Sequence, residues 1–255
     1  MPGVDPRAVV LLSHGLAEHS GRYAHVADRL AASGYAIYAV DHRGHGRSSG
    51  RRSLVDRIDN AVEDLHSLSG LAVRAHPGRP VFLIGHSMGG AIAAAYALKY
   101  QAELAGLVLS APALVIEGVS PVQMQVGKLL SAIAPGAGII RLDATAVSRD
   151  PDVVRAYETD PLNFRGRIPA RTGAELIKLA AEAPLRLKDL RLPILVIQGA
   201  ADRLVPPRAG GVVVDAVSSP DKTVRMYDGL YHEVFNEPER DRVLTDVVEW
   251  LDRHT

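Results

Sequence analysis

The chain has 255 residues, 47% hydrophobic and 23% charged, which is the composition of an ordinary globular protein. Its 29 basic and 29 acidic residues give a formal net charge of zero, which argues against a nucleic-acid-binding surface. The absence of cysteine excludes disulfides, thiol catalysis and cysteine-ligated metals.

The sequence gives no sign of export or membrane insertion. Residues 1–6 lack the basic start and the apolar stretch of a secretory signal. No apolar run approaches the length of a membrane span. We therefore expect a cytoplasmic protein, with peripheral membrane association as an open alternative.

Strand-like and helix-like segments alternate over the first part of the chain. This alternation predicts an α/β fold with a mainly parallel sheet flanked by helices. In the helix at 58–75, Val62, Leu65, Leu68 and Val73 are spaced as one apolar stripe. We expect strands at residues 8–12, 36–40, 81–84 and 104–109, and helices at 23–32, 58–75 and 91–98.

A Gly-His-Ser-Met-Gly-Gly turn at residues 85–90 joins the third predicted strand to a helix rich in small residues. A Gly-x-Ser-x-Gly turn in that setting is typical of a nucleophile elbow, which presents the serine hydroxyl above the sheet. Glycine is required because side chains at 85 and 89 would collide with the strand or the helix. We therefore predict that Ser87 is a catalytic nucleophile.

Residues 112–190 break the alternation and contain helical runs with little strand signal. We expect them to form a helical cap over Ser87, inserted between core segments 1–111 and 191–255. Their apolar residues at helical spacing predict a stripe packed on the cap's own core. The alternative is that they form the entrance of an apolar acyl tunnel and also insert into a lipid surface. These residues are Val122, Val126, Leu129, Leu130 and Ile133.

Two further polar residues follow predicted strands in the last part of the chain. Asp202 follows the strand at 193–197, and His232 follows the strand at 223–227, before a final helix at 241–253. The order Ser, Asp, His is that of the elbow class, so we predict the triad Ser87–Asp202–His232. Individually, Asp202 could be a turn carboxylate and His232 a surface histidine.

An acyl-transfer site also needs two N–H donors for the developing oxyanion. The residue after the nucleophile supplies one of them, here Met88. We assign the second to the Leu16 N–H, in the loop after the first strand, with Ala17 as the alternative.

Other kinds of site fit the sequence poorly. His42 and His45 could suggest a metal, but the glycine-broken loop and the missing ligand set argue against one. The glycines at 85–90 lack the Gly-Lys-Ser/Thr ending of a phosphate loop. A serine at the elbow argues against hydrolases of this fold that use aspartate as the nucleophile. We expect neither a metal nor a cofactor.

Taken together, the segments at residues 14–23, 41–48, 85–90 and 231–233 resemble the monoacylglycerol lipases, above all the bacterial, actinobacterial-type members. The resemblance extends over essentially the whole chain and implies a serine hydrolase of the α/β-hydrolase fold. It also implies that Glu18 and Arg22 lie near the glycerol end of the substrate. The alternative is a structural ion pair four residues apart.

The resemblance includes one departure. Family members usually carry a β-hairpin before the first strand predicted here, and we expect this hairpin to be missing. Either the start is truncated or this is a minimal natural form, and the exposed sheet edge would be open to strand pairing.

The predicted activity is cleavage of monoacylglycerols to fatty acid and glycerol through an acyl-enzyme. A broader carboxylesterase or lysophospholipase would keep the triad and accept other leaving groups. A non-catalytic binding protein is the third alternative, because fold does not dictate function. Partners expected besides the small lipid ester are a lipid surface touched by the cap, or a second copy of the chain in a homodimer.

Overall fold

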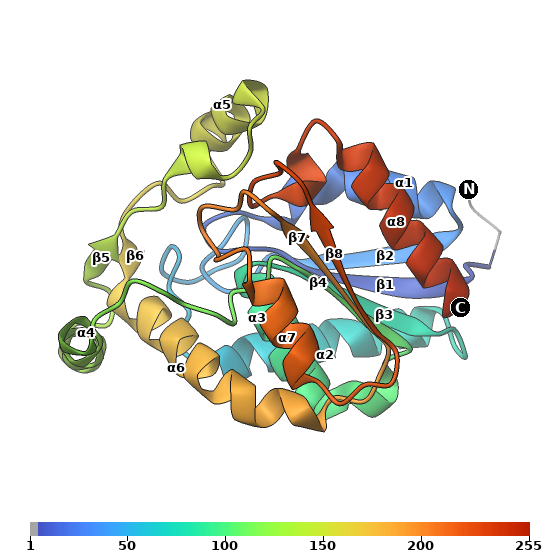
Figure 1. Cartoon of the computed structure of the whole chain (residues 1–255), viewed down its shortest axis with the longest axis horizontal. Helices are drawn as coiled ribbons and strands as arrows, with labels where there is room; N and C mark the ends of the chain where they lie inside the picture. Colours follow the sequence, from blue (N-terminus) through green and yellow to red (C-terminus); the bar gives the residue numbers. More distant parts are fainter. Residues whose placement is uncertain (1–4) are drawn as a thin grey trace.

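A six-stranded parallel sheet forms the centre of the computed structural model, which describes residues 5–255 (Figure 1). Its strand order is β2-β1-β3-β4-β7-β8, so the chain runs outward from β1 in both directions. The strands are β1 (Ala8–Ser13), β2 (Tyr35–Val40), β3 (Val81–His86), β4 (Gly106–Ser110), β7 (Ile194–Gly199) and β8 (Lys222–Tyr227). Central strands buried on both faces explain the continuous Val, Ile and Leu runs in the sequence.

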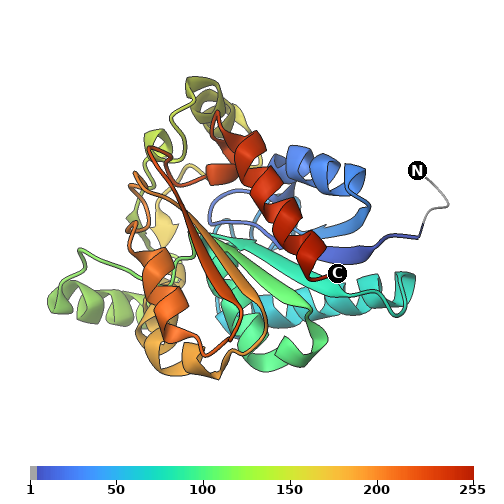
Figure 2. The ribbon, with the colours of Figure 1, turned by 45° about the vertical axis from the view of Figure 1, so that its right-hand side comes forward.

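Helices cover both faces of the sheet, which confirms the predicted fold class (Figures 1 and 2). One face is covered by α1 (Ala24–Ala32) and α8 (Arg240–Arg253), and the other by α2 (Ile58–Ala75), α3 (Met88–Tyr100) and α7 (Ala209–Ala216). Short 3-10 turns lie at Ser20–Tyr23, Gln101–Glu103, Ala144–Ala146, Leu187–Asp189 and Val234–Asn236.

The apolar stripe expected on α2 is only partly correct. Val62 and Leu65 are buried, but the Val73 side chain is 43% exposed. In the last turn of α2 the buried position belongs to Ala72, which is fully covered. Helical spacing alone could not show which of these two neighbours faces the sheet.

Between β4 and β7 the chain leaves the sheet and forms the segment predicted as a cap. It contains α4 (Pro121–Ile133), β5 (Gly138–Ile140), α5 (Pro151–Thr159), β6 (Ile168–Pro169) and α6 (Ala170–Arg186). Strands β5 and β6 pair as a small antiparallel sheet, too short to give an alternating pattern in the sequence. Helix α6 reaches back to pack against α3 and α7, so it links this segment to the core.

The packed stripe predicted on α4 is wrong for most of its members. Val122, Val126, Leu129 and Ile133 are 72%, 51%, 60% and 71% exposed, and Leu130 is half-buried. The helix packs against α6 and stands at the periphery of the molecule, so most of its apolar surface has no protein to cover it (Figure 1). The residue of α4 that is buried is the polar Ser131.

Two sequence expectations concern the start of the chain. These are the absence of a secretory signal at residues 1–6 and the absence of a hairpin before the first strand. Both concern residues 1–4 in part, which lie outside the described residues. From residue 5 onward, no helix has the length and apolar character needed to cross a membrane.

Candidate active site

Ser87 occupies a strained turn between β3 and α3. Its φ of +54° lies in the left-handed region that non-glycine residues rarely adopt. The turn is crowded, because a Cβ on Gly89 would lie 2.1 Å from the Ser13 carbonyl oxygen. The Ser87 N–H donates to the Ser110 carbonyl of β4 at 2.8 Å, which holds the turn against the neighbouring strand. These features are those of a nucleophile elbow.

Asp202 and His232 form a buried pair at the carboxyl ends of β7 and β8. His232 Nδ1 donates to Asp202 Oδ2 at 2.8 Å. The second carboxylate oxygen accepts the N–H groups of Leu204 at 2.8 Å and Val205 at 3.0 Å. Asp202 is therefore both the turn carboxylate and the partner of His232, and its orientation is fixed from both sides. Ser87, Asp202 and His232 all line one cavity.

Burial and ion pairing act in opposite directions on these two groups. Burial lowers the pKa of His232, but the charge and hydrogen bond of Asp202 outweigh it and leave the pKa above its ordinary value of 6.5. Burial raises the pKa of Asp202, but His232 and the two backbone N–H groups outweigh it, so the net pKa is lowered. Asp202 is therefore ionised over the range in which His232 titrates.

We expect the acid limb of the pH profile of kcat/KM to lie above pH 6.5. A general base must be neutral to accept a proton, and the raised pKa of His232 keeps it protonated to a higher pH than free histidine. Asp202→Asn should remove the cause of the shift, move the limb downward, and lower kcat by about 10⁴-fold. A limb that stays in place in Asp202→Asn would show that another group titrates.

The two predicted oxyanion donors both lie on the cavity wall, whereas Ala17 does not. Met88 begins α3, where backbone N–H groups have no partner within the helix. Gly15, the residue before Leu16, is held at both its carbonyl and its N–H. His14 Nδ1 donates to the Gly15 carbonyl at 2.7 Å, and the Gly15 N–H donates to Glu18 Oε1 at 2.6 Å.

A buried polar cluster lies beside these donors. The Arg22 guanidinium donates to Glu18 Oε2 at 2.6 Å and to both carboxylate oxygens of Glu233 at 2.6 and 2.7 Å. The Tyr23 hydroxyl donates to Glu18 Oε1 at 2.7 Å, and Arg22 lies 4.9 Å from the centre of the Tyr157 ring. The structural ion pair between Glu18 and Arg22 is therefore present. Glu18, Glu233 and Tyr157 line the cavity, and Arg22 does not.

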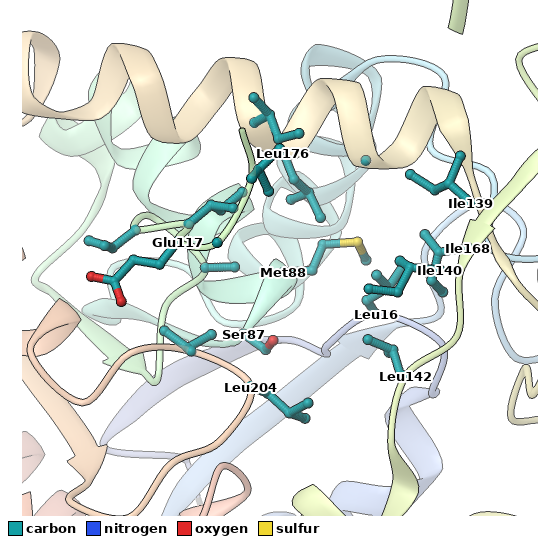
Figure 3. Close-up of a pocket in the computed structure, with 18 of the residues that line it drawn as sticks. Leu16, Ser87, Met88, Glu117, Ile139, Ile140, Leu142, Ile168, Leu176 and Leu204 are labelled. Carbon is teal, nitrogen blue, oxygen red and sulfur yellow. The ribbon is translucent and has the colours of Figure 1, made fainter. Parts of the chain in front are cut away.

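The cavity has a volume of about 1350 Å³ and extends from Ser87 into the segment between β4 and β7. Figure 3 shows Ser87 surrounded by apolar side chains of the core and of that segment. The labelled apolar residues are Leu16, Met88, Leu142, Ile139, Ile140, Ile168, Leu176 and Leu204. Most of the lining is thus apolar, and Glu18 and Glu233 form a polar end close to Ser87. Other charged residues that line the cavity are Glu117, Lys128, Lys178 and Glu182.

The histidines considered as metal ligands belong to a hydrogen-bonded loop. His42 Nε2 lies 2.9 Å from Ser13 Oγ, and its backbone N–H donates to His14 Nε2. His45 Nδ1 contacts the Arg43 carbonyl. Over residues 5–255 we find no cluster of three or more His, Cys, Asp or Glu side chains arranged to hold a metal ion.

Sequence reasoning missed Gln198 as a member of the site. Its side chain is fully buried on β7, and Nε2 donates to Asp202 Oδ2 at 2.7 Å, the same oxygen that His232 contacts. Its position four residues before Asp202 is the only sequence signal that could have indicated it. Glu233 and Tyr157 were missed for another reason, because they reach the cluster from distant parts of the chain.

Known proteins are similar to the chain over nearly its full length. The family described as Serine aminopeptidase, S33 matches residues 4–239. A monoacylglycerol lipase of Mycolicibacterium smegmatis is 49% identical, covering 99% of this chain and 91% of that protein.

Two solved structures are similar as well. The monoacylglycerol lipase of Paleococcus ferrophilus has a TM-score of 0.91 at 33% identity, covering 99% of this chain and 97% of that one. A soluble variant of the Saccharomyces cerevisiae monoglyceride lipase, in complex with a substrate analogue, has a TM-score of 0.88 at 25% identity, covering 100% and 89%. The parallel sheet described above is therefore that of an α/β-hydrolase.

Proposed function

The chain belongs to the serine aminopeptidase S33 family and is similar over nearly its full length to monoacylglycerol lipases, and on that basis we propose that it hydrolyses monoacylglycerols to fatty acid and glycerol. The observation that carries the proposal is the geometry of one cavity. A strained serine and a buried Asp202–His232 pair open onto a long apolar space with a polar end.

The proposed reaction proceeds in two steps through an acyl-enzyme. Ser87 Oγ attacks the ester carbonyl while His232 Nε2 takes its proton, and the N–H groups of Leu16 and Met88 receive the oxyanion. The C–O bond to glycerol then breaks, and His232 gives its proton to the departing oxygen. Water repeats the sequence on the acyl-enzyme and releases the fatty acid. Asp202 keeps the proton of His232 on Nδ1 and stabilises the imidazolium.

We assign residues 112–190 the role of a cap that holds the acyl chain. Support comes from the apolar side chains that this segment contributes to the cavity wall, and from the uncovered apolar surface of α4. Val122 and Val126 both line the cavity and are exposed to solvent, so the apolar surface of α4 connects the outside of the molecule with the cavity. A lipid surface suits this path better than a second copy of the chain, since the substrate is itself a lipid.

Glu18 and Arg22 take different roles in this proposal. Glu18 faces the cavity, where a carboxylate can accept hydrogen bonds from the hydroxyls of glycerol. Arg22 does not line the cavity, and its ion pairs hold the Glu18 and Glu233 carboxylates in place.

The substrate assignment is tested by comparing esters of one acyl chain. We expect fatty-acid release from 1-monoacylglycerol to exceed release from di- and triacylglycerol and from lysophosphatidylcholine, measured as kcat/KM. Equal rates on every ester would identify a general carboxylesterase with the same triad. No release from any ester would favour a binding protein of this fold.

A further inference from the structure

The polar end of the cavity has a charge imbalance. Two carboxylates, those of Glu18 and Glu233, lie on its wall. Within residues 5–255, Arg22 is the cation at ion-pair distance from both of them. Burial raises the pKa of Glu233, but Arg22 outweighs it and lowers that pKa to about 2. The Glu18 carboxylate accepts three hydrogen bonds, one of them from Arg22. Two carboxylates paired with one guanidinium give these three groups a net charge of −1.

The cation of this cluster does not line the cavity. The Arg22 guanidinium donates hydrogen bonds to Glu18 and to both carboxylate oxygens of Glu233, and one of its faces lies against the Tyr157 ring. Tyr157 and the two glutamates line the cavity while Arg22 does not. A bound molecule therefore meets the carboxylates first and the guanidinium only behind them.

This charge lies close to the reacting atoms. An idealised Cβ on Gly15 would be 2.7 Å from Glu18 Oε1 and 3.4 Å from Ser87 Cβ, so those two atoms are within about 6 Å of each other. Glu233 binds the same guanidinium as Glu18 and lines the same cavity, so it lies at the same end. The leaving alcohol of an ester attacked by Ser87 therefore lies beside the carboxylates.

The neighbouring titratable groups do not cancel the charge. Burial lowers the pKa of His14, His45 and His86 to about 4 in each case, so these rings are neutral at pH 7. Asp202 adds a further negative charge, which the imidazolium of His232 offsets. Arg203 also lines the cavity, but it is paired with Asp143.

We propose that Glu18 and Glu233 select the leaving alcohol by its charge. Esters of neutral polyols and of cationic alcohols fit the site, and esters whose alcohol carries a phosphate are rejected. This inference rests on the proposed ester hydrolysis and narrows its substrate class. Coulomb's law at an effective dielectric constant of about 20 gives one unit charge at about 6 Å a roughly hundredfold effect on an equilibrium constant.

The direct test compares two esters of the same medium-length fatty acid that differ in charge and hardly in shape. These are the choline ester and the 3,3-dimethylbutyl ester, in which carbon replaces the quaternary nitrogen. We expect the wild-type kcat/KM to favour the choline ester at least tenfold. A second pair, 1-acylglycerol and 1-acylglycerol 3-phosphate, should favour the uncharged alcohol by at least tenfold. Both ratios should persist in 0.5 M salt, since buried charges are screened little.

The variants Glu18→Gln and Glu233→Gln assign the effect to these carboxylates. In each variant, the kcat/KM ratio of either ester pair should be about tenfold closer to one than in the wild type. Both esters of a pair are measured on the same protein, so the ratio does not depend on how much of the variant is folded. Glu117→Gln is the matched control, because Glu117 also lines the cavity but has an arginine of its own, Arg208, whereas Glu18 and Glu233 share one. It should keep the wild-type ratios.

The outcomes separate this inference from the proposed function. Hydrolysis of both neutral esters with charge ratios near one in the wild type would overturn charge selection and leave the lipase proposal standing. Ratios that survive in both glutamine variants would overturn the assignment to Glu18 and Glu233. No hydrolysis of either neutral ester would overturn the proposed function and this inference with it.

Discussion

Replacing Ser87 with alanine should lower kcat for monoacylglycerol hydrolysis by about a millionfold. Loss of the nucleophile in a related triad has an effect of this size, because no other group forms the acyl-enzyme. Residual activity would come only from the oxyanion donors and from substrate binding. The measurement is fatty-acid release under single-turnover conditions, combined with labelling by a fluorophosphonate, which should be lost together with activity.

The substitution should leave the fold intact. Alanine has no more difficulty than serine with the φ of +54°, and the Ser87 backbone N–H keeps its bond to Ser110. Ser67→Ala, on the exposed face of α2, is the matched control and should retain wild-type rates. A Ser87→Ala protein with more than about a hundredth of wild-type activity would contradict the assignment of the nucleophile.

The sheet and the elbow could be predicted because each depends on a pattern of residues that are adjacent in the sequence. A strand buried on both faces leaves an unbroken apolar run, and the turn at residues 85–90 needs glycine at fixed positions. Asp202 and His232 could be proposed from chain order and from their places after strands. In each case a local pattern was enough to indicate the position of the residue in the fold.

What the sequence could not show depends on contacts between distant segments. The i,i+4 spacing of Glu18 and Arg22 predicts an ion pair, but nothing local indicates that Glu233, 211 residues away, binds the same guanidinium. The apolar spacing of α4 is equally compatible with a packed face and with an exposed one. Only the position of α4 at the edge of the molecule decides between them.

Arg22→Met should lower the free energy of unfolding by about 3–5 kcal/mol, the range found when one partner of a buried ion pair is removed. Methionine fills similar space but leaves the Glu18 and Glu233 carboxylates buried without a counter-ion. Glu18 also holds the Gly15 N–H beside the predicted oxyanion donor, so kcat should fall more than stability alone explains. The measurement is urea denaturation of wild type and variant, with kcat determined well below the transition.

The stability difference should also depend on pH in a defined direction. In the wild type, Arg22 lowers the pKa of Glu233 from 4.5 to about 2, so its ionisation stabilises the fold fully above pH 4.5 and is lost as the pH falls toward 2. The variant lacks this contribution, so its deficit should be largest at neutral pH and shrink below pH 4.5. Arg22→Lys keeps the charge but loses the bidentate geometry, and should show an intermediate deficit with the same pH trend. A deficit that is constant from pH 7 to pH 3 would mean that Arg22 stabilises the fold by packing against Tyr157 rather than by neutralising the two glutamates.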